Sequence, residues 1–207
     1  MPIKNKITPE IKKAFLEEIK KTKVTGREQG FPICIDKKGK LFAPTKRCEG
    51  EECGIFIGNI HEYCPDKVQG GFHTHTNMID VEKFYGRKLS EQEIENAIKL
   101  YKRYFEREGT MIQTPSHHDL VDTLINQCVG ETKGTICTGS DLDENKVECW
   151  TVKGERVKIR DCSRATEEHK ERISTGPRKW IKPLYDKEII DLKDGKKMTE
   201  KLWKMLR

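Results

Sequence analysis

The chain lacks any long apolar run. No stretch of its 207 residues approaches the length that a membrane-spanning helix needs. The N-terminal sequence MPIKNKITPEIKK has no apolar core of the kind that a secretory signal peptide requires. The sequence therefore predicts a protein that is not anchored in a membrane and that stays in the cytoplasm.

The chain also lacks a zinc-ribbon pattern, although eight cysteines are many for a cytoplasmic protein. None of them forms a CxxC pair, so a zinc site with four cysteine ligands is not expected. Three lie in strand-like runs, where we expect them as small buried residues: Cys34, Cys137 and Cys149. Three lie nearer to turns, where a disulfide is the alternative, as in intracellular proteins of hyperthermophiles: Cys48, Cys53 and Cys64.

No long basic block is present, even though the chain carries a formal net charge of +6. Its 40 basic and 34 acidic residues are mixed along the chain, and no basic stretch is interleaved with aromatic residues. This pattern indicates a solvated surface of mixed charge and argues against nucleic-acid binding. Abundant Lys, Glu and Ile with few Gln and Asn is typical of a thermophilic source.

The chain has a clear succession of helix and strand patterns. Thr8 as the N-cap and Pro9 in the first helical position predict a helix that ends before Gly26. We expect strands in four stretches after it: 31–36, 40–45, 53–58 and 68–74.

Residues 76–112 differ in character and are predicted to form a helical insertion. A capping box, Ser90-Glu-Gln-Glu93, begins its helix, and Gly109 ends it. Another helix begins at Pro115. We expect further strands at 132–140, at 146–152 and around Val157 and Ile159.

Two parts are predicted from this succession. Residues 1–160 form the main domain, and residues 161–207 form a basic C-terminal extension with a short helix pattern near Trp203. No internal repeat or low-complexity tract is present.

His73-Thr-His75 ends the strand that is predicted at 68–74. Strand side chains alternate between two faces, so both imidazoles point to the same side. Two imidazoles at a strand end make half of a metal site, and we expect zinc as its ion, because neutral imidazole suits it and catalytic zinc has three protein ligands plus water. By itself, the HxH pattern also fits two ordinary hydrogen-bonded histidines.

Pro115-Ser-His-His-Asp119 has the pattern of a helix N-terminus, in which Ser116 and Asp119 cap each other. An acid in the first helical turn can also reach a metal that the two histidines hold, and the serine can donate a hydrogen bond to an oxyanion. His117 and His118 are competing ligands, although we expect both to be exposed in the first turn.

Together, HTH and PSxxDL resemble the signature of the JAMM (MPN+) family of zinc metalloproteases: a glutamate, then H-[S/T]-H-P, then S-x-x-D. The resemblance covers roughly residues 8–155. It implies an α/β (α+β) fold, in which a mixed sheet flanked by helices forms a JAB/MPN-like (cytidine-deaminase-like) core. It also implies Zn²⁺ on His73, His75 and Asp119. The implied reaction is hydrolysis of a peptide or isopeptide bond in a protein or peptide substrate, which in this family includes ubiquitin-like modifiers.

The resemblance further implies a glutamate as the general base, and the chain offers two. Glu28 lies between the first helix and a strand, which is the family's usual position. Glu51 lies in a run, EECGIFIG, that resembles one common in the family, but it follows a hairpin and leaves few residues for strands before His73. We favour Glu28 as the base and Ser116 as the oxyanion donor.

The chain departs from the family pattern in two ways. Thr76 replaces the proline after the second histidine, and the link between His75 and Ser116 is far longer than usual. A folded insertion can leave and return at modest entropic cost, so the site can survive it.

Two other functions stay open. One is a metal-free scaffold protein of the same family. The other is a phosphoesterase of the PHP type, whose enzymes also use HxH at a strand end but need a barrel of about 250 residues.

Overall fold

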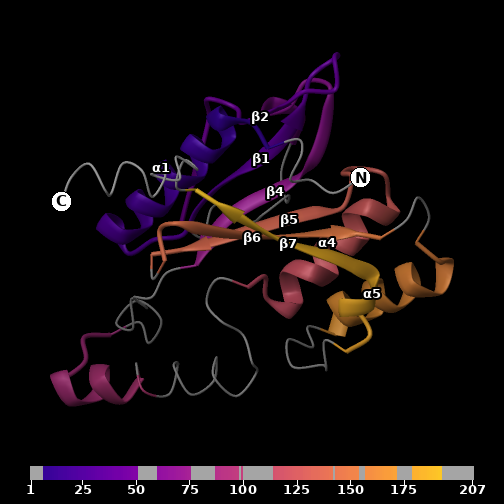
Figure 1. The fold of residues 1–207 in the computed structure, drawn as a ribbon. Helices are drawn as coiled ribbons and strands as arrows, with labels where there is room; N and C mark the ends of the chain where they lie inside the picture. Colours follow the sequence, from indigo (N-terminus) through magenta and orange to yellow (C-terminus); the bar gives the residue numbers. More distant parts are fainter. Residues whose placement is uncertain are drawn as a thin grey trace, which may run out of the picture.

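A computed structural model describes residues 7–50, 60–75, 87–97, 99, 114–141, 143–153, 157–171 and 179–192. These residues form a mixed α/β fold, in which a strongly curled, seven-stranded sheet has helices on both faces (Figure 1). The α/β class and the mixed sheet flanked by helices, as expected from the sequence, are confirmed.

The strands follow the spatial order β2-β1-β4-β5-β6-β7, and β3 pairs with β1 on the same side as β2. Only β4 and β5 are parallel; every other pair among the described strands is antiparallel. This sheet differs from the all-parallel barrel that a PHP-type enzyme needs. The strands are β1 (Gln29–Ile35), β2 (Leu41–Phe42), β3 (Cys48–Glu49), β4 (Lys67–His75), β5 (Thr135–Ser140), β6 (Lys146–Val152) and β7 (Tyr185–Asp191).

Helix α1 (Pro9–Thr25) covers one face of the sheet. The Thr8 hydroxyl accepts a hydrogen bond from the backbone N–H of Ile11 and caps the helix, as expected. Gly26 ends it in the left-handed conformation, with φ 66°, which glycine adopts without strain. The buried side of α1 packs on the strands through aromatic contacts, and the ring centroids of Phe15 and Phe72 lie 4.4 Å apart.

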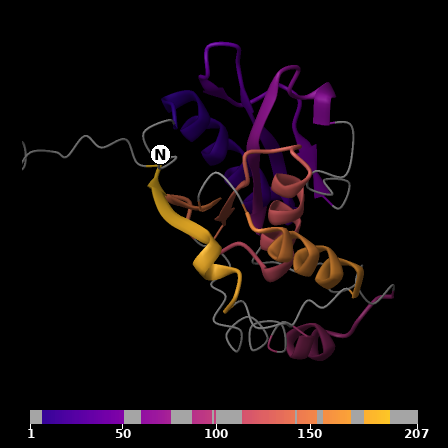
Figure 2. The ribbon, with the colours of Figure 1, turned by 90° about the vertical axis from the view of Figure 1, so that its right-hand side faces the viewer.

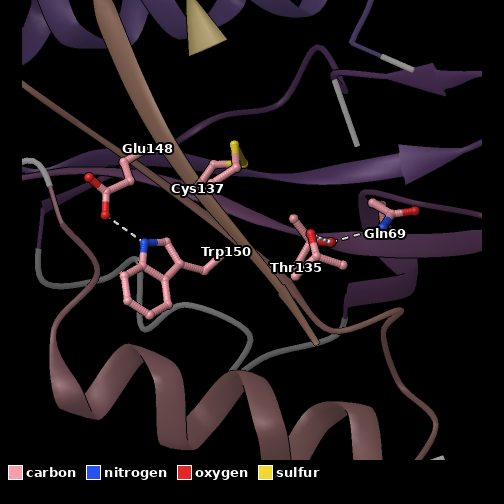
Figure 3. The surroundings of a disulfide bond; sticks show 7 residues. Gln69, Thr135, Cys137, Glu148 and Trp150 are labelled. Atoms are coloured by element: carbon pink, nitrogen blue, oxygen red, sulfur yellow. Dashed lines mark hydrogen bonds between the residues drawn. A yellow bond between two sulfur atoms is a disulfide. The ribbon is translucent and has the colours of Figure 1, made fainter. Parts of the chain in front are cut away.

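Helices α4 (His117–Cys128) and α5 (Ile159–Glu171) cover the opposite face, and Figure 2 shows them apart from α1. Leu120 of α4 packs in a second core cluster with Trp150 of β6. Figure 3 shows the Trp150 ring and the Cys137 sulfur on opposite sides of the sheet, as strand alternation requires. The sheet thus separates two apolar cores.

Six of the eight cysteines form three disulfides: Cys34–Cys64, Cys128–Cys162 and Cys137–Cys149. Cys34, Cys137 and Cys149 are buried, as expected, but each of them is also disulfide-bonded, which was not expected. Cys137 and Cys149, for example, are directly opposite across β5 and β6, so their side chains share a face. Cys48 is a free thiol, and Cys53 lies outside the described residues.

The strand expected around Val157 and Ile159 is wrong, because α5 begins at Ile159. The two apolar residues suggest alternation, but the Ile159 side chain is exposed. The helix is held instead by buried Ala165 and by the disulfide from Cys162 to α4. Tertiary contacts therefore outweigh the weak local pattern here.

The segment expected as a C-terminal extension contributes α5 and β7. Strand β7 pairs with β6 over its whole length, from Val152–Tyr185 to Lys146–Asp191. Ile190 belongs to the core cluster that α1 covers. Residues 159–171 and 185–191 are therefore part of the same packed structure, whereas the helix pattern near Trp203 lies outside the described residues.

The helical insertion is described only in part. The capping box is confirmed, because the Ser90 N–H donates to Glu93 Oε2 at 2.8 Å and the Glu93 N–H donates to Ser90 Oγ at 3.4 Å. Residues 91–97 are helical and lie apart from the sheet in both ribbon views. The helix end at Gly109 and the strand expected at 53–58 lie outside the described residues.

Candidate metal centre

Two histidines lie together at the C-terminal end of β4, which is an interior strand of the sheet. His73 is buried and His75 is half-buried, and their Nε2 atoms lie 2.8 Å apart. Both side chains lie on the face that α4 covers, because only Thr74 between them points to the α1 side. The shared direction expected from HxH is therefore confirmed.

The start of α4 supplies the third side chain. Ser116 is the N-cap, and its Oγ accepts a hydrogen bond from the Asp119 N–H at 3.1 Å. In return, Asp119 Oδ2 accepts one from the Ser116 N–H at 2.6 Å. The same Oδ2 lies 3.4 Å from His73 Nε2 and 3.6 Å from His75 Nε2.

The chain topology explains why these two motifs meet. β4 and β5 are parallel neighbours, so the segment between them must return to the starting edge of the sheet, and α4 does so. A helix in such a crossover begins near the carboxyl end of the preceding strand. That end is where open α/β sheets usually bind ligands.

The three donor atoms suit a transition metal. They are separated by 2.8, 3.4 and 3.6 Å. These separations are close to the roughly 3.4 Å between the donors of a tetrahedral zinc ion with ligands at about 2.0–2.1 Å. Two imidazoles and one carboxylate also form a donor set that zinc uses in catalytic sites. His73, His75 and Asp119 can therefore hold a metal ion.

The electrostatics keep the carboxylate ionised. Burial raises the pKa of Asp119, but the charges and hydrogen bonds of His73 and His75 outweigh burial and hold that pKa well below its usual range. His73 Nδ1 is buried and has no hydrogen-bond partner among the described residues. Metal-binding histidines usually donate from their second ring nitrogen, so this atom departs from the usual pattern.

Glu28 immediately precedes β1, in which Gly30 pairs with His73. That pairing, continued by two residues beyond its described end, would put Glu28 opposite His75. The Glu28 side chain is exposed, and its carboxylate is not one of the three clustered donors. Its role as a base stays a prediction, as does that of Glu51, which lies outside the described residues.

The two remaining histidines of the PSHHD motif do not join His73 and His75. His117 is buried, with its Nε2 2.8 Å from Glu168 of α5, and His118 Nε2 lies 3.2 Å from Asp122. The expectation that both are exposed is wrong for His117, because α5 packs over the first turn of α4.

Thr74 and Gly30 support the group and were not expected to do so from the sequence. The buried Thr74 hydroxyl accepts a hydrogen bond from the Gln29 N–H at 2.8 Å and contacts the Thr22 hydroxyl of α1. Gly30 leaves room for His73, since a Cβ at this position would lie 3.2 Å from His73 Cβ and 2.6 Å from the Phe72 carbonyl oxygen. The sequence does contain a signal for the role of Thr74: it is a polar residue at a strand position whose side chain points towards α1.

Comparison with protein-family models, with curated proteins and with solved structures found no match for this chain. The functional assignment therefore depends on the two motifs and on the group that they form.

Proposed function

We propose that the protein is a zinc-dependent hydrolase of the JAMM type, with a JAB/MPN-like core, that cleaves a peptide or isopeptide bond. One observation carries the proposal: three metal-ligating side chains from two distant motifs converge on one point. A helix cap does not require Asp119 to meet His73 and His75, so capping alone does not explain the arrangement. A ubiquitin-like modifier attached to a lysine is the substrate class to test first.

Neighbouring residues would supply the general base and the oxyanion donor that amide hydrolysis needs. A zinc ion held by the group would polarise a substrate carbonyl and lower the pKa of water towards neutrality. Glu28, immediately before β1, would take a proton from the attacking water and deliver it to the leaving amine. The Ser116 hydroxyl, at the positive end of α4, would donate a hydrogen bond to the oxyanion.

The cytoplasmic location is also a proposal. No helix in the described part of the chain is long and apolar enough to cross a membrane. Three disulfides are typical of oxidising compartments and also of intracellular proteins of hyperthermophiles. We favour an intracellular protein of a hyperthermophile, because the Lys-rich and Glu-rich composition agrees with such a source.

The test combines elemental analysis of protein purified without chelator with an assay on isopeptide-linked ubiquitin-like conjugates. We expect His75→Ala and Asp119→Ala to carry one zinc equivalent fewer than the native chain and to lose all activity. Glu28→Gln should keep the zinc and lose activity by about 10²-fold or more, because a general base is removed while the ligands remain.

Glu17→Gln is the matched control, since this glutamate is exposed on α1. It should keep both zinc and activity. If Glu51→Gln loses activity in place of Glu28→Gln, the base is Glu51. A native chain without zinc and without chelator-sensitive activity would contradict the proposal and favour the scaffold alternative.

A further inference from the structure

A second set of metal-ligating side chains lies between α4 and α5. His118 and Asp122 are one helical turn apart on α4, and His169 approaches them from α5. His118 Nε2 lies 3.2 Å from Asp122 Oδ2, and His169 Nδ1 lies 2.8 Å from Asp122 Oδ1. We propose that these residues form a second divalent transition-metal site, with zinc as its ion, that clamps α5 to α4.

The donor chemistry favours a metal over simple ion pairs. Both histidines direct a ring nitrogen at one carboxylate, and all three donor atoms lie within 4.8 Å of one another. The two rings are stacked, with their centroids 5.8 Å apart and an angle of 19° between their planes. Exposed ion pairs contribute little to stability, so pairing alone gains little from this convergence.

The exposure of the three side chains fits a site that is open to solvent on one side. His118 and His169 are 57% and 45% exposed, whereas Asp122 is only 18% exposed. A divalent ion can therefore enter from water and keep water on its open side, as ions with three protein ligands do.

The position of the set suggests a structural purpose. The Cys128–Cys162 disulfide joins the end of α4 to the beginning of α5. The proposed site joins the opposite ends of the same two helices, beside the 2.8 Å contact of His117 with Glu168. A metal there would hold the first turn of α4, the turn that also contains Asp119, without contributing to any reaction.

The experiment is zinc binding at pH 7.5 in a His75→Ala background, which removes the group at the end of β4. Competition with a chromophoric zinc chelator gives the stoichiometry. We expect His75→Ala to bind one equivalent of zinc and His75→Ala/His169→Ala to bind none. Zinc should also raise the Tm of His75→Ala and leave that of the double variant unchanged.

Lys170→Ala in the same background is the matched control, because this neighbour on α5 is exposed and outside the set. It should keep the full equivalent. If His75→Ala binds no zinc, or if the double variant binds as much as His75→Ala, the proposal is wrong and the histidines form only ion pairs with Asp122. Circular dichroism of the double variant excludes misfolding as the cause of a loss. The zinc stoichiometry and the Tm do not depend on activity. They therefore test the second metal site even if the protein proves not to be a hydrolase.

Discussion

Asp119 combines a local and a tertiary interaction on one oxygen atom. Its Oδ2 accepts the N-cap N–H of Ser116 and also faces the Nε2 atoms of His73 and His75. The capping bond limits the rotation of the carboxylate and so holds it towards the histidines before any metal binds. Such preorganisation reduces the entropy that ligand binding must overcome.

At the same scale, we predict that Gly30→Ala disturbs the metal centre. The added Cβ would lie 2.6 Å from the Phe72 carbonyl oxygen and 3.2 Å from His73 Cβ, so β1 and β4 must separate. We expect a loss of about 1–3 kcal/mol in the free energy of unfolding, as for other overpacked sites, and weaker zinc binding. Urea unfolding and zinc competition measure the two effects.

Gly130→Ala is a useful control for this prediction. Its φ of 83° makes any side chain strained, but a Cβ there meets no atom within 4 Å. It should lower stability and leave zinc affinity unchanged. Equal zinc affinity in Gly30→Ala and the native chain would show that His73 does not depend on the space at Gly30.

At the scale of secondary-structure elements, α4 and α5 act as a joined pair beneath the sheet. The Tyr185 hydroxyl of β7 donates a hydrogen bond to the Leu120 carbonyl oxygen of α4 at 2.6 Å, and Trp180 donates one to Glu168 of α5 at 2.7 Å. α5 has few buried residues of its own. Its position is therefore set by its contacts with α4 and with the segment before β7.

We predict that the Cys128–Cys162 bridge is the main covalent contribution to this pair. It closes a loop with a sequence separation of 34 residues, and loss of such a crosslink costs about 3–4 kcal/mol in the chain-entropy model. Cys128→Ala/Cys162→Ala should lower the urea midpoint accordingly under non-reducing conditions. Cys48→Ala, which removes a free thiol, should change it little. An unchanged midpoint in the double variant would mean that the bridge does not form.

At the scale of the whole molecule, β7 forms one edge of the sheet and contributes Ile190 to the core that α1 covers. Ile189 and Ile190 test this directly, because they are neighbours with opposite environments: 53% and 3% exposed. Ile190→Ala should reduce the free energy of unfolding by about 2–5 kcal/mol through lost burial and a cavity. Ile189→Ala should change it by about 0.5 kcal/mol or less. Equal effects in thermal or urea unfolding would show that β7 is not docked as described.

The sequence by itself determined the features that are encoded within a few residues. The caps of α1, the capping boxes at Ser90 and Ser116, and the strand that ends in HTH are such features, because their signals span one helical turn or one strand period. The motif resemblance also selected His73, His75 and Asp119 as candidate ligands before their positions were known. Glu28 and Ser116 remain predictions as catalytic residues.

Only the tertiary structure decided which distant segments are neighbours. The pairing of six cysteines, the helical state of α5, the burial of His117 and the place of β7 in the sheet all depend on contacts between residues far apart in the chain. The same is true of the set formed by His118, Asp122 and His169. Local propensity differs by less than about 1 kcal/mol per residue between most alternatives, so burial and crosslinks determine the outcome wherever the local pattern is weak.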